Sequence, residues 1–138
     1  MKPYAPRATR AKAVDREGQE QAALLTEIEL RYPEVFALIF HVPNGGHRHK
    51  TVAIKLKQQG VKAGVPDLVL PMARGGYFGL YIEFKATPPH DAAVSTTQSA
   101  YLKALIAQGY LAIVCRGHAD AMEQLRAYLH LAPTRAVA

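Results

Sequence analysis

The chain has 138 residues, 49% of them hydrophobic and 20% charged, which is the composition of one globular domain with a real core. Its longest apolar run, Val35 to Phe40, is too short to span a bilayer, the N-terminus lacks the apolar segment of a signal peptide, and a single cysteine excludes an intrachain disulfide. We therefore expect a cytoplasmic protein without membrane attachment, and the net charge of +6 favours a polyanionic partner.

The two ends of the chain are predicted to lie outside this domain. Residues 1–13 carry four basic side chains and two prolines without apolar periodicity, which predicts a flexible basic arm. Residues 133–138 follow the last apolar pattern and predict a short tail. The domain itself is then expected to cover residues 14–132.

The first predicted helix covers residues 15–31, where apolar residues recur at helical spacing until a proline follows. Its first turns carry Glu17 and Glu20. These acids are either solvated charges at the positive end of the helix dipole, or one of them reaches a functional site. Glu17 lies four residues before Gln21 and so shares its face of the helix.

The next stretch alternates between apolar and basic character. Residues 35–42 are almost all apolar and predict a buried strand, and residues 43–48 contain two glycines and predict a loop. Residues 49–59 predict a short basic helix that ends at Gly60. The side chains of this helix expected to face inward are Val52, Ala53 and Leu56.

The centre of the chain predicts a β-hairpin. One strand covers residues 67–72, a Gly-Gly turn follows, and the second strand starts at Tyr77 or Gly79 and ends near Thr87, before two prolines.

The last third predicts a helix, a strand and a helix. Ser95 and Gln98 have the spacing of a capping box, which starts a helix that runs to about residue 108. A buried strand at residues 110–115 contains Cys115, which we interpret as inert core, and a final helix covers residues 118–131. The side chains of the capped helix expected to face inward are Tyr101, Leu102, Leu105 and Ile106. The element order α-β-α-β-β-α-β-α indicates an α/β fold with one mixed sheet flanked by helices.

A charged pair interrupts the second hairpin strand. Glu83 and Lys85 are two residues apart and share one face, while Leu80, Ile82 and Phe84 share the other. Burial of this pair has a desolvation cost that a divalent metal would offset, and Asp67 on the neighbouring strand could supply a second carboxylate. These three residues alone are also compatible with an exposed hairpin. The apolar residues around them favour a metal site instead.

Carboxylates are hard ligands that match Mg²⁺ or Mn²⁺, and the backbone carbonyl of Phe84 is placed to complete the shell. Lys85 would orient a water, help deprotonate it, or stabilise charge on a phosphate; the three roles stay open. Gln98 either completes only the helix cap, or also holds Lys85 or the attacking water.

A basic run precedes the candidate site. Residues 41–66 contain no Asp or Glu, and this run is either a solvated face or a surface for a phosphate backbone. The nucleic-acid contacts that we predict are Asn44, Gly45, His47, Arg48, Lys50 and Lys62.

Several separate stretches resemble the VRR-NUC branch of the PD-(D/E)xK nucleases. They are Glu17-Gly-Gln-Glu-Gln21, Pro43-Asn-Gly-Gly-His-Arg48, Gly60 to Asp67 with its Pro-Asp end, Gly79-Leu-Tyr-Ile-Glu-Phe-Lys85, Gln98, and Gly109-Tyr110. The resemblance implies a restriction-endonuclease-like core in which Asp67 and Glu83 bind Mg²⁺ or Mn²⁺, Lys85 assists catalysis and Gln98 belongs to the same site. It also implies a helical acid, which Glu17 fits better than Glu20.

The chain resembles the stand-alone phage and bacterial type of this family. The resemblance implies a structure-selective DNA endonuclease that resolves Holliday junctions as a homodimer. A single site per chain supports the dimer, for which Tyr77-Phe78 and the last helix are candidate interfaces. The alternatives are a flap, splayed-arm or general DNA nuclease, and a non-catalytic DNA-binding module on the same fold.

Overall fold

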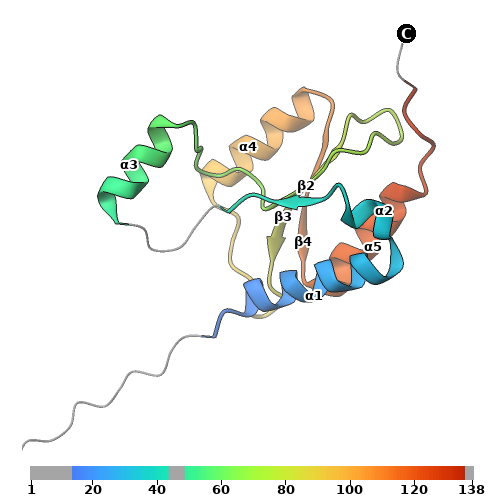
Figure 1. Cartoon of the computed structure of the whole chain (residues 1–138), viewed down its shortest axis with the longest axis horizontal. Helices are drawn as coiled ribbons and strands as arrows, with labels where there is room; N and C mark the ends of the chain where they lie inside the picture. The colour runs from blue at the N-terminus through green and yellow to red at the C-terminus, as the bar shows by residue number, and fades with distance from the viewer. Residues whose placement is uncertain (1–13, 44–48, 136–138) are drawn as a thin grey trace, which may run out of the picture.

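A computed structural model describes residues 14–43 and 49–135 of the chain. In these ranges a four-stranded sheet with the order β1-β2-β3-β4 lies between helices (Figure 1). The helices are α1 Arg16–Arg31, α2 Pro33–Phe36, α3 Lys50–Gln58, α4 Thr96–Ala107 and α5 His118–Leu129, and the strands are β1 Phe40–His41, β2 Leu68–Leu70, β3 Leu80–Lys85 and β4 Leu111–Arg116. None of these helices is long and apolar enough to cross a membrane.

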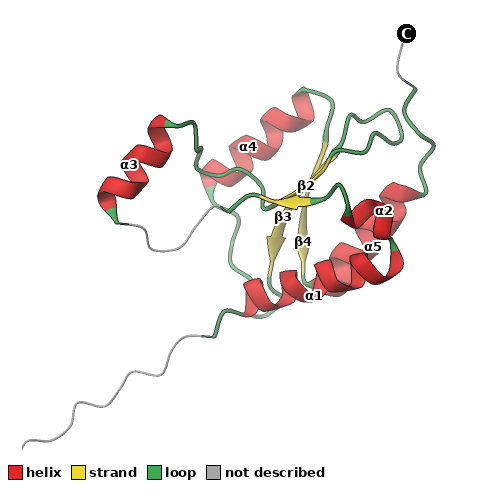
Figure 2. Cartoon of the chain, in the orientation of Figure 1, coloured by secondary structure: helices red, strands yellow, loops and turns green. Residues whose placement is uncertain are grey.

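The sheet is mixed, as predicted. Strand β2 pairs antiparallel with β1 and β3, and β3 pairs in parallel with β4. Helices α1, α2 and α5 cover one face of the sheet and α4 lies on the other (Figure 2). Strand β3 is therefore buried on both faces, and its polar pair cannot reach solvent as an ordinary hairpin would.

The main core lies between the sheet and the layer of α1, α2 and α5. Leu80, Ile82 and Phe84 of β3 enter this core, as their alternation predicts. Leu24 and Ile28 of α1 are each 1% exposed and pack in the same cluster. The opposite face of β3 is left for Glu83 and Lys85, on the side of α4.

The predicted strand at residues 35–42 is wrong over most of its length. Residues 33–36 form helix α2, and only Phe40–His41 pair with β2. The physical reason is Pro33, whose fixed backbone angle suits the first turn of a helix, so that it ends α1 and begins α2. Residues 14–43 and 49–135 thus contain one more short helix than we predicted, and β1 is an exposed edge strand.

The predicted helix at residues 49–59 exists, but it does not face inward as expected. His49 caps its N-terminus, and Gly60 follows its C-terminus at a φ of 104°. Val52 is 49% exposed and Ala53 is exposed as well, while Leu56 is half-buried. Figure 1 shows α3 standing apart from the sheet, which explains why none of its nine residues is buried.

Helix α4 begins as predicted, with Ser95 as N-cap and the complete capping box with Gln98. Leu102 is buried, but Ile106 is 55% exposed, so its predicted inward orientation is wrong. Cys115 is fully buried in β4, and burial raises the pKa of its thiol to about 12, which agrees with an inert core residue.

The segment that follows α5 contacts the turn between β2 and β3 through Thr134. Thr134 donates its hydroxyl to the carbonyl of Tyr77 and accepts from the amide of Gly76. Tyr77 packs against Tyr128 of α5, whereas Phe78 is 61% exposed. Of the two residues proposed as an interface at this turn, Phe78 is the more exposed, although its ring also packs edge-on against Tyr110.

Candidate active site

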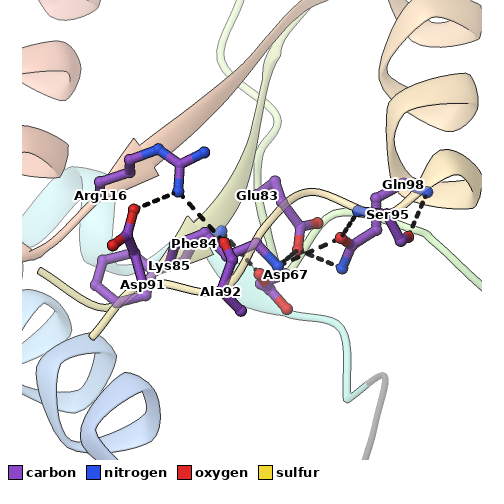
Figure 3. Close-up of polar contacts among 9 residues, drawn as sticks. All are labelled: Asp67, Glu83, Phe84, Lys85, Asp91, Ala92, Ser95, Gln98 and Arg116. Atoms are coloured by element: carbon purple, nitrogen blue, oxygen red, sulfur yellow. Dashed lines mark hydrogen bonds and ion pairs between the residues drawn. The ribbon is translucent and has the colours of Figure 1, made fainter. Parts of the chain in front are cut away.

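Glu83 and Lys85 form a buried ion pair at the end of β3. Glu83 is 1% exposed and Lys85 5% exposed, and Lys85 Nζ lies 3.4 Å from Glu83 Oε1 (Figure 3). A single buried carboxylate and ammonium carry a desolvation cost that their mutual attraction offsets only in part. The fold therefore holds two charges where apolar side chains would be less costly, which indicates a functional reason for them.

Asp67 joins this pair from the start of β2. Its Oδ2 accepts a hydrogen bond of 2.7 Å from the amide of Phe84, so the carboxylate lies against the strand segment between Glu83 and Lys85. A strand residue directs its N–H and C=O to the same side, so the carbonyl of Phe84 also faces Asp67. Two of the oxygen donors that the sequence suggested as metal ligands, the carboxylates of Asp67 and Glu83, are close enough for the charge of Asp67 to act on Glu83.

Gln98 connects the cap of α4 to the charged pair. Its Oε1 accepts from the amide of Ser95 at 2.9 Å and from Lys85 Nζ at 3.3 Å, and its Nε2 donates to Glu83 Oε1 at 2.8 Å. The two roles that we considered for Gln98 are therefore compatible without any change of partner. The cap fixes the amide, and the amide orients Glu83 and Lys85 relative to each other.

The electrostatics of Glu83 favour an added cation. Burial, and next the charge of Asp67, raise the pKa of Glu83 to about 7 despite the nearby ammonium of Lys85. In the described part of the chain, Glu83 Oε2 is a buried oxygen without a hydrogen-bond partner. A divalent ion would satisfy this oxygen and relieve the repulsion between the two carboxylates, so the donor set fits Mg²⁺ or Mn²⁺.

Two acids and a carbonyl leave most of the coordination shell to water. Within residues 14–43 and 49–135, no three Asp, Glu, His or Cys side chains gather closely enough to hold an ion by themselves. Mg²⁺ usually keeps several waters and takes only one or two carboxylates, so this sparse set remains suitable for it.

The two helical acids differ in their surroundings. Burial raises the pKa of Glu17, Lys85 lowers it and Asp67 raises it, so Glu17 faces the candidate site. Glu20 instead accepts from the amide and the hydroxyl of Thr87, which lower its pKa. Glu20 is therefore engaged in holding the chain after β3, and Glu17 is the acid whose charge is felt at the site.

The predicted nucleic-acid contacts are described only in part. Lys62 lines a cavity that also borders Asp67 and Gln98, and Lys50 is exposed in the first turn of α3. Asn44, Gly45, His47 and Arg48 lie outside the described residues.

Two positioning contacts were not foreseen from the sequence. His41 Nδ1 donates to the carbonyl of Asp67 at 2.9 Å, and the amide of Gln21 lies 3.1 Å from the same nitrogen. The common face of Glu17 and Gln21 was a usable signal, but the position of His41 depends on the β1–β2 pairing.

The second contact involves Arg116, which pairs in register with Lys85. Its Nη1 binds Asp91 Oδ2 at 2.7 Å and the carbonyl of Ala92 at 3.3 Å, which ties the loop before Ser95 to β4 (Figure 3). Nothing in the sequence spacing indicates this pairing.

Comparison with known proteins agrees with this geometry. The sequence model of the VRR-NUC domain matches residues 15–119. The solved structure of a VRR_NUC domain protein is similar to this chain at 29% sequence identity and a TM-score of 0.75, over 88% of this chain and 93% of that one. No curated protein matches the chain. The matched range includes every residue of the candidate site.

Proposed function

Because this chain belongs to the VRR-NUC domain family and so carries a nuclease-type domain, we propose that it is a divalent-metal-dependent DNA endonuclease that hydrolyses phosphodiester bonds. The observation that carries this proposal is the buried Glu83–Lys85 pair, in which one carboxylate oxygen has no hydrogen-bond partner among the described residues while the charge of Asp67 acts on the same carboxylate. A non-catalytic DNA-binding domain has no need of two buried charges in its central strand.

In this proposal Asp67, Glu83 and the carbonyl of Phe84 hold the ion. When bound, Mg²⁺ or Mn²⁺ supplies Lewis-acid stabilisation of the phosphate and lowers the pKa of the attacking water. Glu83 must be deprotonated for this role, and Gln98 Nε2 favours that form by donating to Oε1.

Lys85 acts on the phosphate side of the site. Its ammonium is held by Gln98 Oε1 and Glu83 Oε1, so it is preorganised beside the position of the scissile phosphate. A fixed cation in a buried site stabilises the charge that develops in the transition state without reorganisation at the moment of reaction. Glu17 completes the site as an acid that orients water from the side of α1.

We infer further that the substrate is branched DNA, with the four-way junction first among the branched forms, and that the enzyme works as a homodimer. This rests on the resemblance to the VRR-NUC family and on symmetry, because paired incisions need two sites related by a two-fold axis. Exposed Phe78 is a candidate interface residue.

The proposal is tested by cleavage of junction, flap, splayed-arm and duplex DNA with Mg²⁺ and with Mn²⁺, beside a measurement of mass in solution. Asp67→Asn, Glu83→Gln and Lys85→Met should each lower cleavage by about 100-fold or more, since each removes a group from the metal or phosphate site. The side chain introduced by Asp67→Asn still has an oxygen that can accept from the amide of Phe84, so this variant should stay folded. Equal cleavage by parent and variants would refute the assignment.

A further inference from the structure

A cavity of about 470 Å³ opens beside the candidate site, within the volume range of small-molecule pockets in proteins. Asp67 and Gln98 of the candidate site are among the residues that line it. Its other walls come from α3 and from the segment at residues 61–65, which in Figure 1 passes between α3 and α4 on its way to β2. The candidate active site described above includes Asp67 and Gln98 but does not use these walls.

The walls combine two chemical characters. Aliphatic surface comes from Ala53, Leu56, Val61 and Val65, and positive charge comes from Lys57 and Lys62. Among the lining residues that the structure describes, Asp67 is the only acid, and none is aromatic. A ligand that fits this lining has an apolar body and carries anionic groups.

The wall at residues 61–65 is held in place by close packing on α4. Gly64 has a φ of 81°, and a Cβ at this position would come within 2.8 Å of the carbonyl oxygen of Thr97. Thr97 immediately precedes Gln98, whose side-chain amide contacts Glu83 and Lys85. The wall therefore packs on the same turn of α4 that carries this amide. The distance between wall and site is thereby set by the fold.

We propose that this cavity binds the nucleoside next to the scissile phosphate, with its base unpaired and out of the stack. The proposal rests on the nuclease function proposed above and specifies its substrate. A phosphate at the metal site places the neighbouring nucleoside one linkage away, at the mouth of the cavity. The aliphatic walls pack on its base and sugar, and Lys57 and Lys62 attract the flanking phosphates.

This geometry excludes a base that remains paired inside a continuous helix. Extrusion of a paired and stacked base is unfavourable, and least so where the base already lacks a partner. The enzyme should therefore cut next to unpaired nucleotides, which occur at branch points and bulges, faster than inside matched duplex. Selectivity for DNA structure then comes from the cavity and needs no reading of base sequence.

The first experiment compares cleavage of a matched duplex with that of the same duplex carrying a one-nucleotide bulge, both with Mn²⁺. We expect the bulged duplex to be cut at least about tenfold faster beside the bulge, in line with the cost of extrusion. Ala53→Phe fills the cavity and should bring this ratio close to one. Ala107→Phe adds the same ring at the exposed last residue of α4, outside the lining, and should keep the parental ratio.

The second experiment measures binding without cleavage. DNA with 2-aminopurine as the bulged base, mixed with the parent protein and Ca²⁺, should fluoresce several-fold more strongly on binding. The base then leaves the stack for a cavity whose described lining residues include no aromatic quencher. The same increase should be absent in Ala53→Phe and present in Ala107→Phe.

The two experiments separate the possible failures. Cleavage of both duplexes at equal rates, with no fluorescence change, would refute the cavity proposal and leave the nuclease function standing. Absence of cleavage of any DNA together with a fluorescence increase would refute the nuclease function and support the cavity as a nucleoside site.

Discussion

The amide nitrogen of Gln98 donates to Glu83 Oε1 over 2.8 Å, while the oxygen of the same amide accepts from the N-cap residue of α4. A helix cap is thus part of the candidate active site. The N-terminus of α4 and the end of β3 are held in one geometry by a single side chain, which makes Gln98 the residue where stability and activity can be separated most sharply.

Gln98→Glu should keep the helix and lose activity. A glutamate still accepts from the amide of Ser95, so the capping box remains, but it cannot donate to Glu83 and adds a negative charge beside it. We expect DNA cleavage to fall by about 10- to 100-fold, with helix content by circular dichroism unchanged. The matched control is Ser95→Ala, which loses about 1 kcal/mol of stability with the cap and keeps the amide of Gln98. Full activity in Gln98→Glu would mean that Gln98 serves the helix alone.

Glu17→Gln should lower DNA cleavage more than stability, whereas Glu20→Gln should lower stability more than cleavage. Glu17 faces Lys85 and Asp67, so its loss should lower cleavage by about tenfold or more and leave stability almost unchanged. Glu20 binds Thr87 after β3, so its loss should cost about 1 kcal/mol in chemical denaturation and change cleavage little. The reverse pattern would identify Glu20 as the helical acid of the site.

Stabilisation by a divalent ion should depend on pH through Glu83. Its pKa in the folded protein is raised to about 7 from an ordinary 4.5, so its contribution to stability is present below 4.5 and is lost as the pH rises through 7. An ion must displace this proton, and it stabilises only the folded state. The rise in melting temperature with Mn²⁺ should therefore be small at pH 5.5 and reach a plateau above about pH 8.

Glu83→Gln provides the control for this titration. The variant has no carboxyl proton at this position, so any remaining effect of Mn²⁺ on its melting temperature should lack the rise around pH 7. A similar pH profile in the parent and in this variant would show that another group governs ion binding.

Gly64→Ala should destabilise the domain and disturb the cavity wall. The new methyl group would meet Thr97 at a backbone angle that L side chains rarely adopt, with an expected cost of about 1–3 kcal/mol. Gly60→Ala is the matched control, since its φ is also positive but nothing lies within 4 Å of the added Cβ. Thermal unfolding should show a clearly larger loss for Gly64→Ala; equal losses would mean that only the backbone angle matters.

The sequence determined the local parts of this site. The two-residue spacing of Glu83 and Lys85 puts both on one face of a strand wherever that strand lies. The Ser95–Gln98 spacing specifies a helix start, because the cap bonds join residues three apart. The mixed α/β fold follows from the same local periodicities, and the structure confirms it.

Only the tertiary structure decided which of these parts meet. The contact of Gln98 with Glu83 requires α4 to cross the sheet, and that of Asp67 with Phe84 requires the β2–β3 register. The wrong prediction of a strand at residues 35–42 has the same cause. A short apolar run does not reveal whether it forms a strand or a helical turn, because that depends on the segments it packs against. Local spacing acts within a few residues, whereas burial, charge pairing and register arise between segments far apart in the chain.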